Sequence, residues 1–157
     1  MRYRTLLVLI ALSLSLSSTA CKKEPTEIKV IPFTNLSIVM DKGIYKPGDV
    51  ATLTINNHTD MDLILEPCGS EPGFDFQKLI NGKWNKVLTT DCMGETVEPF
   101  SIPAGSTFKH TVTIPLLSLI KGDHNGQYRL LLWLKDKKNL EFLEKEDRAS
   151  DPFVIRE

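Results

Sequence analysis

Residues 45–57 read YKPGDVATLTINN and decide the fold of this chain. Residues 46–49 place Pro and Gly at the two central positions of a turn, which favours a type II turn. After the turn, Ala51, Leu53 and Ile55 alternate with Val and Thr residues. A period of two with many β-branched residues predicts a strand and disfavours a helix. We therefore expect a long core strand that buries these three side chains.

The limits of this strand follow from the same pattern. Asn56 and Asn57 are predicted to end it, because Asn favours turns over strand interiors. A shift of register by one residue would bury Thr52 and Thr54, so the pattern specifies the inward face.

Composition and charge are those of an ordinary globular protein. The length of 157 residues predicts one domain. The hydrophobic fraction of 41% and the charged fraction of 25% are usual for globular proteins. The net charge is −1, and it becomes −3 without residues 1–20, with 17 basic against 20 acidic residues. Basic runs do not exceed two residues and are not interleaved with aromatic residues, so we expect no nucleic-acid partner.

The N-terminus has the features of an export signal. Arg2 and Arg4 precede an apolar stretch at 6–16, and small residues at 18–20 precede Cys21. The apolar stretch is shorter than the roughly 20 residues that span a bilayer. We expect a signal peptide at 1–20, followed by a short polar tether at 21–27.

This N-terminal pattern resembles the signal of bacterial lipoproteins, in which the cysteine after the cleavage site receives lipid. The resemblance implies that Cys21 is a lipid anchor and that the membrane is a partner. It places the protein in the bacterial cell envelope, at the outer membrane or periplasmic face and not in the cytoplasm. Ser18 departs from the pattern, which usually has Leu there. The alternative is a plain secreted protein with a free Cys21.

The cysteine count agrees with this interpretation. The chain has three cysteines, so Cys68 and Cys92 remain as a pair if Cys21 carries lipid. An even pair in an oxidising compartment predicts a disulfide. The alternative, a metal-binding pair, lacks CxxC spacing and a histidine close in sequence.

The strongest hairpin signal is Asn81-Gly82, which fits a two-residue type I′ turn between strands at 74–80 and 83–88. The expected register pairs Leu79 with Trp84, Phe76 with Val87 and Gln77 with Lys86. Alternation predicts further strands at 28–31, 36–40, 61–66, 108–114, 128–135 and 153–155.

The strand at 128–135 is apolar on both faces and is predicted to be central. Whether it exposes Leu131 and Trp133 as an apolar patch stays open. We expect one helical turn at 116–120, and residues 140–148 fit either a strand or a short helix.

Four stretches resemble known bacterial domains: YKPGDVATLTINN at 45–57, NGKW at 81–84, PAGS at 103–106 and GQYRL at 126–130. They are similar to immunoglobulin-like domains of small lipoproteins and to the BsuPI-like intracellular proteinase inhibitor family. The resemblance covers residues 36–156.

This resemblance implies an all-β fold, an immunoglobulin-like antiparallel β-sandwich of about 7–9 strands at 28–157. Tyr128 resembles the structural tyrosine-corner residue of such sandwiches. The inhibitor family is cytoplasmic, whereas this chain has an export signal, and a shared fold does not transfer function.

Side chains suited to catalysis or metal binding are scattered. His58, His110 and His124 are far apart in sequence, and we find no catalytic or phosphate-binding motif. His58 lies near Asp60 and Asp62, which we interpret as a solvated turn and not as a metal site. We likewise interpret residues 123–126 as a plain turn, and the carboxylates at 95, 98 and 141–147 as solvated surface. We expect no catalytic residue, metal or cofactor.

Three hypotheses for function follow. The first is a non-enzymatic envelope lipoprotein whose sandwich binds a protein partner or serves as a structural module. The second is a proteinase inhibitor that uses the segment 68–92. The third is a periplasmic metal-binding protein that uses the histidines.

Overall fold

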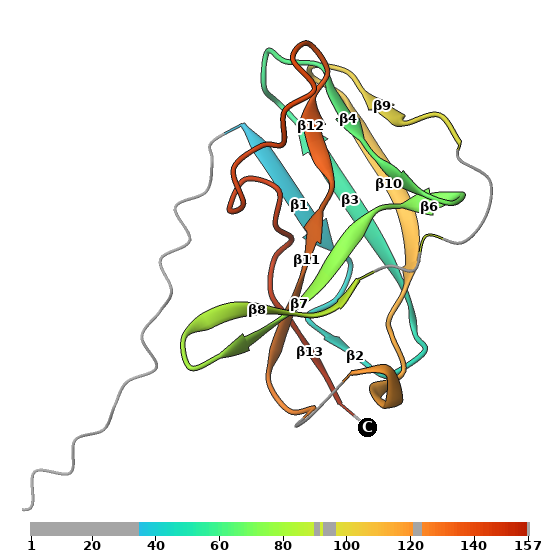
Figure 1. The fold of residues 1–157 in the computed structure, drawn as a ribbon, viewed down its shortest axis with the longest axis vertical. Coiled ribbons are helices and arrows are strands. Elements are labelled where there is room, and N and C mark those ends of the chain that lie inside the picture. Colours follow the sequence, from blue (N-terminus) through green and yellow to red (C-terminus); the bar gives the residue numbers. More distant parts are fainter. Residues whose placement is uncertain (1–34, 90–91, 93–96, 121–123, 157) are drawn as a thin grey trace, which may run out of the picture. The chain divides into compact units, whose positions relative to one another are not determined.

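The predicted core strand is β3 (Val50–Asn57), the middle strand of a three-stranded antiparallel sheet (Figure 1). Its neighbours are β1 (Leu36–Met40) and β10 (Thr107–Thr113). The computed structural model describes residues 35–89, 92, 97–120 and 124–156. The strand predicted at 28–31 lies outside these residues.

The inward face of β3 and the turn before it are as predicted. The Asp49 N–H donates to the Lys46 carbonyl at 3.1 Å, and Gly48 has a φ of +83°, as a type II turn requires. The strand ends at Asn57, as predicted, but the Asn57 side chain is fully buried and adds a fourth inward position that the pattern did not predict. The buried face of β3 consists of Ala51, Leu53, Ile55 and Asn57.

A second sheet of five strands faces the first. Its order is β2 (Ile44–Tyr45), β13 (Phe153–Ile155), β11 (Gln127–Leu132), β7 (Phe74–Ile80) and β8 (Lys83–Thr89). The pair β2–β13 is parallel and the other pairs are antiparallel. β11 lies in the middle and is buried on both faces, as its composition predicts.

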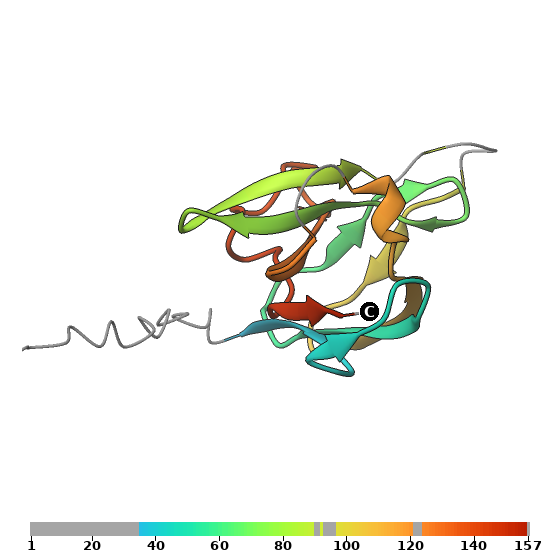
Figure 2. The same ribbon diagram turned by 90° about the horizontal axis from the view of Figure 1, so that it is seen from below.

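Side chains from these two sheets form one hydrophobic core between the layers. Figure 2 shows β7 and β8 in one layer and β1 and β3 in the other. Phe76 and Phe153 pack edge to face at 5.8 Å between ring centroids, and Tyr45 and Tyr128 extend this aromatic cluster. This arrangement confirms an all-β, largely antiparallel sandwich.

A third, smaller sheet has the order β12 (Leu134–Asp136), β4 (Leu63–Leu65) and β9 (Phe100–Ile102). The strand predicted at 61–66 is shorter, and all three residues of β4 are buried, so the expected alternation does not hold. The remaining elements are β5 (Pro67–Cys68), β6 (Glu71–Pro72) and the predicted helical turn, the 3-10 helix η1 (Leu117–Leu119).

The described residues form 13 strands, more than the 7–9 expected, because long strands are interrupted and seven strands have only two or three residues. The stretch 128–135, predicted as one strand, belongs to two sheets. It breaks at Trp133, between β11 and β12.

A ring of three backbone hydrogen bonds forms this break. Trp133 N–H donates to the Gly73 carbonyl at 2.9 Å, and Gly73 N–H donates to the Glu66 carbonyl at 2.8 Å. Glu66 N–H closes the ring by donating to the Trp133 carbonyl at 3.0 Å. Each of the three residues donates its N–H and accepts at its carbonyl. The backbone groups at this junction therefore stay hydrogen-bonded where the chain passes from one sheet to the other.

The hairpin forms at Asn81 and Gly82, whose φ values of +51° and +73° fit the predicted type I′ turn. The predicted pairs Leu79–Trp84 and Gln77–Lys86 are present. The predicted pairing of Phe76 with Val87 is wrong. A register shift between Phe76 and Gln77 pairs Phe76 with Leu88 instead.

Residues 140–148 form neither a continuous strand nor a helix. The chain returns along β12 and β11, with isolated bridges from Lys135 to Phe142 and from Leu131 to Ala149. Leu131 is 4% exposed, so it does not contribute to an apolar surface patch, and Trp133 is half-buried.

Gly73→Ala should strongly destabilise the fold. A Cβ at Gly73 would lie 2.7 Å from Trp133 Cδ2 and 2.9 Å from the Glu66 carbonyl oxygen, and overpacking of this kind costs about 1–3 kcal/mol. Urea denaturation measures the loss. Gly43→Ala is the matched control, because nothing lies within 4 Å of its added Cβ. Equal stability of the two variants would contradict the role assigned to Gly73.

Candidate functional site

Cys68 and Cys92 form a disulfide, as the cysteine count predicts. Their Cα atoms lie 4.5 Å apart and the two residues are 24 positions apart in sequence. A crosslink of this loop length stabilises a fold by about 3 kcal/mol in the chain-entropy model. The bond ties the segment that enters the β7–β8 hairpin to the segment that leaves it. Cys21 lies outside the described residues.

Tyr128 is fully buried, and its hydroxyl donates to the His124 carbonyl oxygen at 2.6 Å. A tyrosine corner is defined by such a bond to the backbone a few residues upstream. His124 in turn has its Nε2 atom 2.9 Å from the Ile120 carbonyl oxygen. This chain of contacts fixes the loop before β11 to the residues that follow η1.

The other two histidines lie apart and have separate contacts. His110 Nε2 lies 2.6 Å from Glu71 Oε2, and its ring stacks on Phe108 at 6.2 Å. The His58 N–H donates to the Asn35 carbonyl at 2.6 Å, and Asp60 beside it is exposed. Within the described ranges, no three His, Cys, Asp or Glu side chains gather as metal ligands would.

An arginine on the outer face of the five-stranded sheet was not predicted as a site. Arg129 is only 5% exposed, although it points away from the core. Its Nε donates to Gln77 Oε1 at 2.8 Å, and its two terminal nitrogens donate to Glu146 at 2.7 and 3.2 Å. The guanidinium lies 4.5 Å from the centroid of a Trp84 ring, so a cation–π contact completes its environment.

Glu146 belongs to the acidic run that we interpreted as solvated surface. Its side chain is 76% exposed, yet it pairs with Arg129 in a bidentate contact. The hydrogen bonds from Arg129 hold the pKa of Glu146 below its usual value. The sequence signal for this cluster is a charged residue inside the apolar strand QYRLLL at 127–132.

Beside β12 of the third sheet, an aromatic ring is exposed between two cations. Phe142 is 52% exposed, and Lys135 Nζ and Arg148 Cζ lie 4.8 and 4.9 Å from its ring centroid. Lys135 also pairs with Glu66 at 2.7 Å. Arg148 donates to the Leu132 carbonyl at 2.9 Å, and burial lowers the pKa of its guanidinium. Phe142 is therefore an exposed aromatic ring held between two fixed basic groups.

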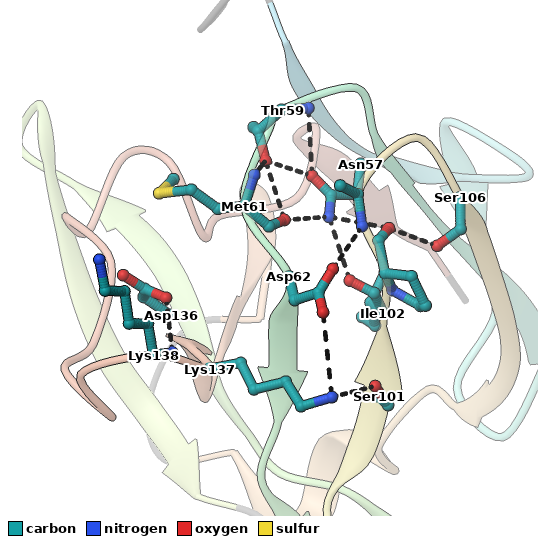
Figure 3. Close-up of polar contacts among 12 residues, drawn as sticks. Asn57, Thr59, Met61, Asp62, Ser101, Ile102, Ser106, Asp136, Lys137 and Lys138 are labelled. Carbon is teal, nitrogen blue, oxygen red and sulfur yellow. Dashed lines mark hydrogen bonds and ion pairs between the residues drawn. The ribbon is translucent and has the colours of Figure 1, made fainter.

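One end of the sandwich is held by the buried amide of Asn57 (Figure 3). Its Nδ2 donates to the carbonyls of Met61, Ile102 and Pro103 at 2.9, 3.1 and 3.1 Å. Its Oδ1 accepts from the Thr59 hydroxyl at 2.6 Å and from the Thr59 N–H at 3.2 Å. Asn57 thus joins the loop at 58–62 to the turn after β9.

Lys137 brings a third loop to the same end. Its N–H donates to the Asp62 carbonyl at 3.0 Å, and its Nζ lies 3.5 Å from Ser101 Oγ and 4.0 Å from Asp62 Oδ2 (Figure 3). The Asp62 carboxylate also accepts from the Ala104 N–H at 3.0 Å. Asp62, first considered as a metal ligand, therefore serves the packing of these loops.

Comparisons with known proteins give weak likenesses only. No family model and no curated protein sequence matches the chain. One similar solved structure is the Pseudomonas fluorescens alkylpurine DNA glycosylase AlkC bound to DNA, with 11% identity and a TM-score of 0.41. A second is the Northeast Structural Genomics Consortium target SoR45, with 17% identity and a TM-score of 0.41. A third is the Bacillus subtilis sporulation control protein Spo0M, with 13% identity and a TM-score of 0.35.

In each case 78% of this chain is aligned, against 30%, 83% and 49% of the respective structures. The chain thus spans under a third of AlkC. At these TM-scores the likenesses carry no inference about function. In the described part of the chain, no helix is both long and apolar enough to cross a bilayer.

Asn57→Ala should cost about 1–3 kcal/mol of unfolding free energy, because it leaves one buried and two partly buried carbonyls without their donor. Asn56→Ala is the matched control. Asn56 is the preceding residue, and its side chain makes exposed contacts to Ser37 and Thr107. Urea denaturation compares the two. Similar small losses in both variants would show that the Asn57 amide does not hold this end together.

Glu146→Gln should weaken the fold at neutral pH and have little effect in acid. The folded-state pKa of Glu146 lies below its usual value of 4.5, so its contribution is present above that pH and is lost as the pH falls further. Because the side chain is exposed, we expect a loss under about 1 kcal/mol. Melting temperatures from pH 7 to 3 test this, with the exposed Glu141→Gln as the control for losing one charge. A pH-independent difference would contradict the Arg129 pairing.

Proposed function

We propose that this protein is a non-enzymatic, lipid-anchored component of the bacterial cell envelope, whose immunoglobulin-like sandwich acts as a binding or structural module. The observation that carries the proposal is the bond between Cys68 and Cys92. The chain has three cysteines, so the one outside this bond is Cys21, directly after the small residues at 18–20. A lipoprotein signal requires its cysteine at this place.

The disulfide also supports the envelope as the compartment. Disulfides persist in oxidising compartments such as the periplasm and are rare in the cytosol. An export signal at 1–20 and a disulfide-bonded domain are therefore consistent with one another. The inhibitor family that the chain resembles is cytoplasmic, so the same observation argues against a direct transfer of its activity.

The outer face of the five-stranded sheet supports a binding role. Arg129 is fixed there by Gln77, Glu146 and the ring of Trp84. Aromatic residues and arginine are enriched in protein interfaces, and rigid side chains lose little entropy on binding. A protein partner in the envelope would find a preorganised surface at this face.

The two alternative hypotheses stay predictions from the sequence. Metal binding through the Nε2 atom of His110 or His124 would have to displace Glu71 or the Ile120 carbonyl, which that atom already contacts. Inhibition of a proteinase through the segment 68–92 would use the loop that the disulfide closes.

Cys21→Ser should move the protein from the membrane fraction to the soluble fraction, because the acyl chains would have no attachment site. Fractionation of cells followed by immunodetection measures this. The matched control is the double variant Cys68→Ser, Cys92→Ser, which removes the disulfide and should leave the protein in the membrane fraction. Membrane retention of the Cys21→Ser protein at the wild-type level would refute the lipid anchor.

A further inference from the structure

Three exposed apolar side chains belong to loops near the end of the sandwich that Asn57 holds. Leu140 is 60% exposed, Phe142 is 52% exposed and Met61 is 38% exposed. They come from two loops that the bond from Lys137 N–H to the Asp62 carbonyl joins. Figure 1 shows the loop after β12 at the top of the domain, far from β2 and from the short coil of η1.

Leu140 is held in a backbone conformation that branched side chains avoid. Its φ is +61°, in the left-handed region. The Leu140 N–H donates to the Asp136 carbonyl at 2.9 Å, and the Asp136 N–H donates to the Glu141 carbonyl at 3.0 Å. These bonds fix the loop with the leucine exposed to solvent. Backbone strain that supports an exposed apolar residue points to a function outside the fold itself.

Basic residues flank this apolar tip. Lys137 and Lys138 are exposed and precede Asn139 and Leu140, and Lys135 and Arg148 lie against Phe142. Glu141 is the acidic side chain between Leu140 and Phe142. Apolar side chains with adjacent lysine and arginine fit the lipid–water boundary, where the former enter the acyl region and the latter reach the phosphates.

The chain that leads to the proposed anchor starts at the same end. Asn35 accepts from the His58 N–H, and Leu36 pairs with Asn57. Thirteen residues separate Cys21 from Asn35, so Asn35 lies at most about 50 Å from the anchored cysteine. A tether of this length keeps the bilayer at high effective concentration near the end that holds Leu140.

We propose that the loop at 136–142, together with Met61, rests on the phospholipid bilayer to which Cys21 is attached. Leu140 enters the headgroup region, and Lys138 contacts lipid phosphates. The contact sets the orientation of the sandwich and leaves η1 and β2 facing away from the membrane. This inference rests on the proposed lipid anchor.

Nitroxide labels on the lipidated full-length mature protein test the orientation. Vesicles of phosphatidylethanolamine and phosphatidylglycerol contain a relaxing agent confined to the headgroups. One label is placed at Asp60→Cys, beside Met61, and the other at Ser118→Cys in η1; both native residues are exposed. We expect at least a fivefold greater relaxation at position 60 than at position 118.

Leu140→Asn separates membrane contact from folding. Asn tolerates a positive φ better than Leu, so the melting temperature should stay the same or rise. The relaxation at position 60 should fall at least twofold. Leu119→Asn is the matched control, because Leu119 is 57% exposed in η1 and its replacement should leave the relaxation unchanged.

The outcomes separate this inference from the proposed function. Equal relaxation at both positions, in protein that floats with the vesicles, would overturn the orientation and leave the anchor intact. Unchanged relaxation in Leu140→Asn would also overturn it and would favour a protein partner for this loop. Protein that does not float with vesicles would refute the anchor, and the orientation with it.

Discussion

The ring of hydrogen bonds among Glu66, Gly73 and Trp133 is the constraint on which the rest of the structure depends. At this point the chain leaves the five-stranded sheet and pairs with β4 in the third sheet. A side chain on Gly73 would collide with the indole that closes the junction. The loop at 136–142 is therefore placed by a contact made more than 60 residues earlier in sequence, between β4 and β7.

Two buried polar side chains, Asn57 and Arg129, are accommodated in this sandwich by several hydrogen bonds each. Asn57 closes one end by bonding three carbonyls and Thr59, and Arg129 is covered on the outer face by Gln77 and Glu146. An unbonded group at either place would cost the full price of its desolvation. These contacts hold the loops and the outer face rigid, which suits surfaces that recognise a membrane or a partner.

Local sequence patterns correctly predicted the features that depend on interactions between neighbouring residues. The type II turn, the inward face of β3 and the Asn-Gly hairpin depend on adjacent residues, and they were predicted. Asn57 was correctly predicted to end the strand, but its burial was missed because two of the carbonyls that its side chain bonds are 45 and 46 positions away. The break at Trp133 and the Arg129 cluster were missed because Gly73 and Gln77 are distant in sequence.

The intact mass of protein purified from membranes tests the central claim most directly, with alkylation before and after reduction. A lipid-anchored, disulfide-bonded envelope protein should have the mass of a chain that begins at Cys21 plus acyl groups. It should gain two alkyl groups only after reduction, at Cys68 and Cys92. An uncleaved chain in which all three cysteines are alkylated without reduction would contradict both the compartment and the anchor.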